Sequence, residues 1–118
     1  MAAVQAELSA QKYVSGDLVI ANSVQITINH GLGVEPTHIS LYLKCAVAEF
    51  GYAVGDVIRI AGESDQNGSN EAIGVLVNNA QIVLRVGEAG PQAITRKDNG
   101  VGVVSTAANW RLIVKATK

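Results

Sequence analysis

The stretch His30-Gly31-Leu32-Gly33-Val34-Glu35-Pro36, followed by residues 37–45, sets the pattern for the whole chain. Glycine reaches backbone angles that other residues avoid, and proline favours an extended residue before it, so this stretch predicts a turn between two strands. Apolar and polar residues then alternate. The two sets are Ile39, Leu41, Leu43 and Cys45 on one face and His38, Ser40, Tyr42 and Lys44 on the other. This period of two predicts a half-buried β-strand.

Short runs of the same kind recur along the chain. Residues 23–30 alternate strictly, and Asn78-Asn79 separates two further runs, 73–77 and 80–86. Because asparagine tolerates left-handed angles, we expect these two runs to pair as an antiparallel hairpin. About eight short strands with turn signals between them predict an all-β fold, an antiparallel sandwich or a small barrel. This domain covers residues 13–118 and follows a short N-terminal arm, residues 1–12.

The composition is typical of one globular domain that needs neither a disulfide nor a metal. The 118 residues are 48% hydrophobic and 16% charged, which excludes a disordered chain. A formal net charge of −1 argues against nucleic acid or an anionic membrane as the main partner, although local basic patches are compatible with it. No secretory signal pattern and no membrane-length apolar run stand in the sequence, so we expect synthesis in the cytosol.

The candidates for chemistry are weak, so the sequence predicts no enzyme, no cofactor and no metal site. Cys45 falls on an apolar strand face, which favours a buried, inert thiol. His30 and His38 fall on opposite faces, so they cannot share an ion, and turn-stabilising hydrogen bonds are the alternative. Residues 65–71 have the oxygen density of a calcium loop, but their glycine stands at the fourth position instead of the sixth. We therefore expect a solvated loop there.

Three apolar residues, Tyr42, Val83 and Ile113, fall on strand faces that ought to be polar if those faces meet water. They predict a second buried surface, most simply a subunit interface, with scattered apolar surface residues as the alternative. Trp110 shares its strand face with Leu112, which favours a place in the core. The alternative for Trp110 is a stacking platform for a sugar ligand.

Three segments in this order carry a resemblance to a known group of proteins. They are the His30–Pro36 turn with its strand ending in Cys45, then Ala48-Glu49-Phe50-Gly51-Tyr52-Ala53-Val54-Gly55-Asp56, and Ala108-Asn109-Trp110-Arg111-Leu112-Ile113-Val114-Lys115-Ala116. Together they resemble small domains of tailed-bacteriophage virion proteins, found in tail fibres and related surface proteins. The glycine-proline entry and the late tryptophan strand are also similar to H-type lectin-like sandwiches.

The resemblance, which spans about residues 23–116, implies an antiparallel β-sandwich that forms a homotrimer on the virion, assembled in the host cytoplasm. Its implied partners are other virion proteins and, as in the lectin-like relatives, a host-surface glycan, although no glycan-contacting residue carries over. The first hypothesis is a non-enzymatic component of the tail fibre or tail. One alternative is a capsid decoration (cement) protein, whose arm at residues 2–11 would order against the shell. The other is a soluble carbohydrate-binding module that uses Trp110.

Overall fold

The computed structural model describes residues 11–60 and 72–118 of the chain. Within these ranges it forms ten short β-strands and one 3₁₀ turn, and every strand pairing is antiparallel. They are β1 (Lys12–Val14), β2 (Leu18–Val19), β3 (Gln25–Asn29), β4 (His38–Cys45), β5 (Val57–Ile60), β6 (Ile73–Val77), β7 (Gln81–Val86), β8 (Ala93–Thr95), β9 (Gly102–Val104), η2 (Ala107–Asn109) and β10 (Trp110–Thr117). The predicted all-β antiparallel fold is confirmed. In the part of the chain that the structure describes, no helix is long and apolar enough to cross a membrane.

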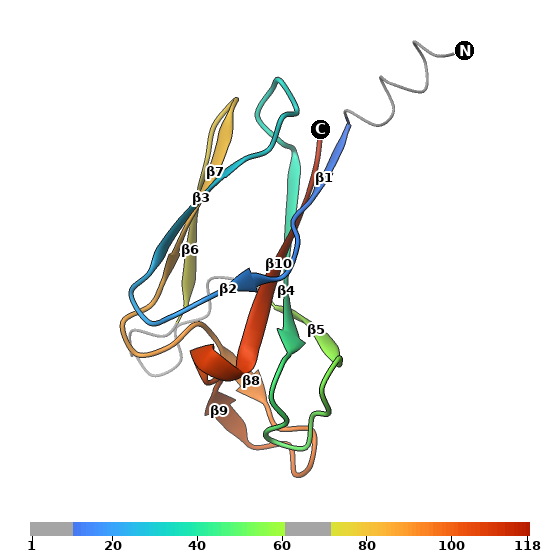
Figure 1. Ribbon diagram of the computed structural model, residues 1–118, viewed down its shortest axis with the longest axis vertical. Coiled ribbons are helices and arrows are strands. Elements are labelled where there is room, and N and C mark those ends of the chain that lie inside the picture. Colours follow the sequence, from blue (N-terminus) through green and yellow to red (C-terminus); the bar gives the residue numbers. More distant parts are fainter. Residues whose placement is uncertain (1–10, 61–71) are drawn as a thin grey trace, which may run out of the picture.

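The strands form two main sheets that face each other as a β-sandwich (Figure 1). The first sheet has the order β1-β10-β4-β5, with β2 also paired to β10, and the second has the order β3-β7-β6. A small third sheet, β8-β9, lies at the lower end in Figure 1. The longest pairing joins β4 to β10, from Cys45 opposite Trp110 to His38 opposite Thr117. Strand β1 begins at Lys12, the last residue of the predicted arm, and residues 1–10 lie outside the described ranges.

The core lies between the two main sheets and takes alternate residues from each. Its completely buried side chains are Leu43, Trp110, Leu112 and Val114 from the first sheet and Ile73, Ile82 and Leu84 from the second. The register accounts for this arrangement, because Leu43 lies directly opposite Leu112 and Leu84 directly opposite Ile26. Residues directly opposite each other on paired strands point to the same face, so each sheet contributes one continuous apolar surface.

The His30–Pro36 stretch carries the chain from the second sheet to the first, between β3 and β4. Gly31 and Gly33 have φ angles of 68° and 80°, which non-glycine residues rarely adopt. Leu32 between them is 3% exposed and belongs to the core. The stretch is thus a crossover and not a hairpin. The predicted placement of its two histidines is nevertheless confirmed, since His30 is buried and His38 is exposed.

The hairpin predicted around Asn78-Asn79 is confirmed, with Val77 of β6 opposite Ile82 of β7. The reason given for it is wrong, because neither asparagine has a positive φ. Instead, the Asn78 side-chain oxygen accepts hydrogen bonds from the backbone N–H groups of Ala80 (2.9 Å) and Gln81 (2.7 Å). A local side-chain acceptor therefore closes this turn in place of left-handed backbone angles.

Candidate functional site

The outward face of the first sheet, called here the first outer face, holds two of the predicted interface residues. Tyr42 on β4 lies directly opposite Ile113 on β10, and both are half-buried. Their neighbours in sequence point to the core, so these two side chains point away from it. The Lys115 ammonium lies 4.6 Å from the centre of the Tyr42 ring, within the range of a cation–π contact.

Three exposed valines extend this apolar surface over the neighbouring strands. Val14 on β1 and Val19 on β2 lie opposite outward residues of β10, and Val57 on β5 lies opposite an outward residue of β4. Their exposed fractions are 59%, 72% and 50%. The five residues Tyr42, Ile113, Val14, Val19 and Val57 are called the apolar patch below. Apolar residues at so many outward positions of one sheet are typical of a surface that a partner covers.

Val83, the third predicted interface residue, lies on the other side of the molecule. It belongs to β7 of the second sheet, where it pairs with Thr27 and Leu76, and Leu76 is 59% exposed. The three residues therefore lie on the outward faces of two different sheets, and their role at a subunit interface stays a prediction. Alternation along a strand shows which residues point outward, but it does not show to which sheet the strand belongs.

Cations surround the apolar patch, a feature that the sequence analysis missed. They occupy outward positions on four strands of the first sheet and are Lys12, Lys44, Arg59, Arg111 and Lys115. Lys44 pairs with Asp17 at 3.1 Å, and an Arg59 guanidinium N–H donates to the Ser40 hydroxyl at 3.5 Å. These residues lie up to about a hundred positions apart in the sequence. Only the register of four paired strands brings them together.

Glu49 lies at the centre of a hydrogen-bond network that ties the turn before β5 to the start of β10. Its Oε1 accepts from the Trp110 indole N–H (2.6 Å) and from the Thr106 backbone N–H (3.0 Å), and its Oε2 accepts from the Asn109 side chain (2.8 Å). Burial acts to raise the pKa of Glu49, but these hydrogen bonds stabilise the carboxylate and hold its pKa below the ordinary value. With its acceptor sites engaged by backbone and side-chain donors, this carboxylate has a structural role.

Trp110 is completely buried, and its ring packs edge-on against Tyr52 with the centroids 5.4 Å apart. The core interpretation of Trp110 is therefore confirmed. Stacking needs one free face of the ring, and a fully buried indole offers none, so the alternative of a sugar platform is corrected here. The indole N–H, the polar part of the side chain, is satisfied by Glu49.

His30 serves the turn that follows it. Its Nδ1 accepts from the Leu32 backbone N–H (3.0 Å), and its Nε2 donates to the Asn78 carbonyl (2.9 Å), with the tautomer assigned from this network. The predicted turn-stabilising hydrogen bonds are confirmed for His30. Cys45 is buried as predicted, and burial raises the pKa of its thiol.

Among residues 11–60 and 72–118, no three His, Cys, Asp or Glu side chains gather as metal ligands. The predicted solvated loop at residues 65–71 lies outside the described residues.

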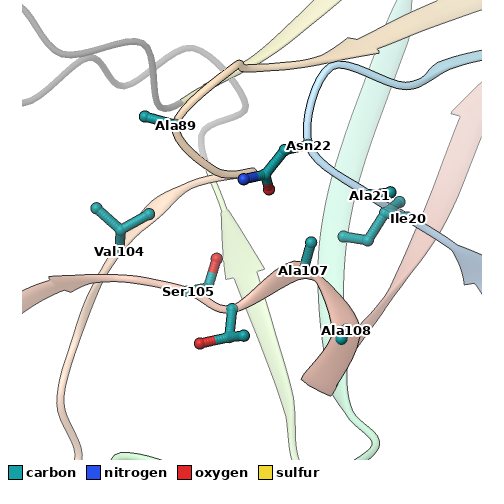
Figure 2. A pocket seen from close by; sticks show the side chains of 9 residues that line it. Ile20, Ala21, Asn22, Ala89, Val104, Ser105, Ala107 and Ala108 are labelled. Atoms are coloured by element: carbon teal, nitrogen blue, oxygen red, sulfur yellow. The ribbon is translucent and has the colours of Figure 1, made fainter.

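A pocket of about 470 Å³ lies between the end of β2 and the η2 turn, and its lining is small and mostly apolar (Figure 2). Ile20, Ala107 and Ala108 contribute apolar surface, and the Ser105 hydroxyl is engaged by the Gln92 carbonyl at 2.9 Å. Asn22 extends a polar side chain at its rim. Among the described residues no charged side chain lines this pocket. It therefore offers little to fix a ligand, since binding sites place convergent polar groups within an apolar lining.

A second depression, about 390 Å³, lies between β5 and β8. Its wall includes Gln92, which is 2% exposed and whose Oε1 has no hydrogen-bond partner. The Tyr52 hydroxyl, on the same wall, donates to the Thr95 carbonyl at 2.6 Å. The depression brings together no pair of groups suited to acid–base or nucleophilic chemistry.

Comparisons with known proteins add no further assignment. The chain matches no protein-family model, and the searches of curated proteins and of solved structures also found no match.

Proposed function

We propose that this chain is a non-enzymatic structural protein of a tailed-bacteriophage virion. It forms homotrimers on the tail or tail fibre and works by contact with other virion proteins. Its place of action is the virion, assembled in the host cytoplasm.

The observation that carries the proposal is the apolar patch on the first outer face. Val19 and Val57 are at least half exposed, and Tyr42 and Ile113 lie beside each other at the middle of the sheet. An antiparallel sheet with one solvated face normally presents polar residues there. Aromatic residues are also enriched at the centres of protein interfaces. A contact surface accounts for both features.

The sequence resemblance supports the proposal from a separate direction. Two of the segments that carry it, residues 48–56 and 108–116, meet in the structure through Glu49 and its bonds to Asn109 and Trp110. These two segments therefore help to hold the fold together. This arrangement suits a module whose function depends on shape and contact.

The first test is the mass of the purified protein, measured by light scattering across a dilution series. We expect a trimer that the Tyr42→Ala variant weakens, because this change removes the aromatic side chain at the centre of the apolar patch. Val83→Ala is the matched control, since it removes an outward apolar residue from the other sheet. A monomer at every concentration would contradict the trimer and favour the capsid decoration protein.

The location on the particle needs a second measurement. Immunogold labelling of virions with an antibody against the purified chain should place the label on the tail or fibre. Label spread over the capsid shell would contradict the tail assignment and support the decoration protein instead.

A further inference from the structure

We infer that a pocket at one end of the first outer face binds a carboxylate group, which an acidic segment of another virion protein supplies. The pocket has a volume of about 290 Å³, and its lining includes Lys44, Arg111, Asp17 and Val54. It is called the paired-cation pocket below. The inference rests on the proposed function only in naming a protein as the source of the carboxylate, because one copy of the chain supplies the whole lining.

The strand register places the two cations of this pocket side by side. Lys44 on β4 lies directly opposite Arg111 on β10, and both are half-buried. Like charges directly opposite each other destabilise a strand pair, and a nearby anion relieves that cost. Asp17 relieves part of it through an ion pair with Lys44 at 3.1 Å. Two cations and one carboxylate sum to a formal charge of +1, which one further carboxylate would neutralise.

Backbone carbonyls hold the Arg111 guanidinium in place. Its Nη1 donates to the carbonyl of Ala108 at 3.2 Å and to that of Trp110 at 3.1 Å. Among the described residues, its Nε and Nη2 have no acceptor, and no carboxylate pairs with it. Nε and Nη2 form the fork of parallel N–H groups that binds a carboxylate with two hydrogen bonds. A fork that is already ordered loses less conformational entropy on binding.

Apolar side chains surround the two cations. Val54, in the lining of the pocket, is 68% exposed. On the neighbouring strands, Val57 lies opposite Lys44 and Val19 lies opposite Arg111. Convergent polar groups within an apolar surface are typical of a binding site. The pocket beside η2 lacks this combination, since no charged side chain lines it among the described residues.

The charge and the size of the paired-cation pocket favour one class of ligand. A carboxylate carries a single negative charge and matches the net +1, whereas a phosphate group carries up to about two. The volume of 290 Å³ lies near the lower limit for ligand pockets, about 300 Å³, so it suits one side chain. An Asp or Glu side chain in a protein segment meets both conditions, and apolar residues beside it can cover the exposed valines.

The test is an NMR titration of the isotope-labelled whole chain at constant ionic strength, which follows the Gly55 backbone N–H and the Arg111 Nε–H. The probes are sodium acetate, inorganic phosphate and a short synthetic peptide in which Glu alternates with Val. Acetate should shift both signals. The peptide should shift the same signals with a dissociation constant about tenfold lower, because its valines also bury apolar surface.

Two variants should change binding in opposite directions. Arg111→Gln removes the fork and should raise the dissociation constant for acetate by about tenfold or more. Asp17→Asn removes the one carboxylate in the described lining and should lower that constant, a gain that loss of folding cannot produce. Lys12→Gln is the matched control, because it removes one charge from the other end of the first outer face, opposite Thr117. Circular dichroism establishes that each variant keeps its sheet content.

The absence of a shift with acetate, or equal binding by Arg111→Gln and Lys12→Gln, would overturn the carboxylate site while the proposed trimer stands. Phosphate binding tighter than acetate would overturn the choice of a carboxylate. Peptide binding no tighter than that of acetate would overturn a protein segment as its source. A monomer in the light-scattering experiment would overturn the trimer and leave this site standing, because a single copy forms the pocket.

Discussion

Glu49 shows how one carboxylate joins parts of the chain about sixty residues apart. Burial raises the cost of its charge, yet it remains ionised because Trp110, Thr106 and Asn109 all donate to it. Its pKa therefore lies below the ordinary value of 4.5. In the unfolded chain those donors are gone, so the pKa returns to the ordinary value there. Folding and the ionisation of this single residue are thus linked.

The pH dependence of stability follows from this difference. Between the folded and unfolded pKa values the unfolded chain binds more protons, so the free energy of unfolding decreases as the pH falls through that range. Above the unfolded value the stabilisation is fully present. We expect urea unfolding, measured from pH 7 downward, to show a falling free energy of unfolding below about pH 5. In the Glu49→Gln variant the part of this pH dependence that comes from Glu49 should be absent.

At pH 7 the Glu49→Gln variant should be less stable than the wild type by about 1–3 kcal/mol, because the new amide N–H₂ faces donors that need an acceptor. Glu35→Gln serves as the control, since Glu35 is an exposed carboxylate in the crossover turn. Equal pH profiles for Glu49→Gln and the wild type would refute the assigned role of Glu49.

The alternation in β4 gives a second prediction for single residues. Leu41 is 4% exposed and points into the core, whereas Tyr42 points outward. Leu41→Ala should lower the free energy of unfolding by about 2–5 kcal/mol, as expected when a buried leucine leaves a cavity. Tyr42→Ala should act mainly on assembly. If urea unfolding of the monomer found the larger loss for Tyr42→Ala, the two faces of β4 would be assigned the wrong way round.

Among the elements, the turn from Glu49 to Tyr52 has the most constrained backbone. Phe50 and Gly51 have φ angles of 56° and 86°, and the Tyr52 N–H donates to the Glu49 carbonyl at 2.9 Å. Two successive positive φ angles are the mark of a type I′ hairpin turn. A phenylalanine at such an angle is strained. It is held by the Lys97 N–H, which donates to its carbonyl at 3.0 Å, and by the Arg96 guanidinium over its ring.

A turn can require glycine because of its positive φ angle or because there is no room for a Cβ atom, and Gly51 and Gly55 differ in the second respect. A Cβ at this position would lie 2.8 Å from the Asp98 backbone nitrogen, whereas one at Gly55, where φ is 97°, would meet nothing within 4 Å. Gly55→Ala should cost about 1–2 kcal/mol for the backbone angle alone. Gly51→Ala should cost more, because the β8–β9 turn must also move. Urea unfolding of the two variants tests this order, and equal losses would show that the contact with Asp98 is unimportant.

At the scale of the whole molecule, the two outward faces of the sandwich differ. The first carries five cations around the apolar patch, and the second carries Val83 and Leu76 beside polar residues such as Thr27. A sandwich whose two faces differ in this way can use one face for assembly and leave the other for different contacts. For this reason the mass measurements pair each variant on the first face with a control on the second.

Several parts of the fold could be predicted because they depend on local patterns. The alternation of Leu41 and Leu43 with Tyr42 gave β4 its correct inward and outward sides, and the glycines around Leu32 marked a real turn. The hairpin at Asn78 was predicted correctly, but the interaction that closes it was not. Side-chain hydrogen bonds and left-handed backbone angles are alternative ways to close such a turn, and here the Asn78 side chain closes it.

By itself, the sequence determined which residues point to the core and where the strands end, because side-chain direction in a strand alternates and turns need particular residues. Only the tertiary structure decided which strands share a sheet. That assignment separated Val83 from Tyr42 and Ile113, gathered Lys12, Arg59 and Lys115 on one face, and joined Glu49 to Trp110. Pairing between strands far apart in the chain depends on how the two apolar surfaces fit together, and no local pattern records that fit.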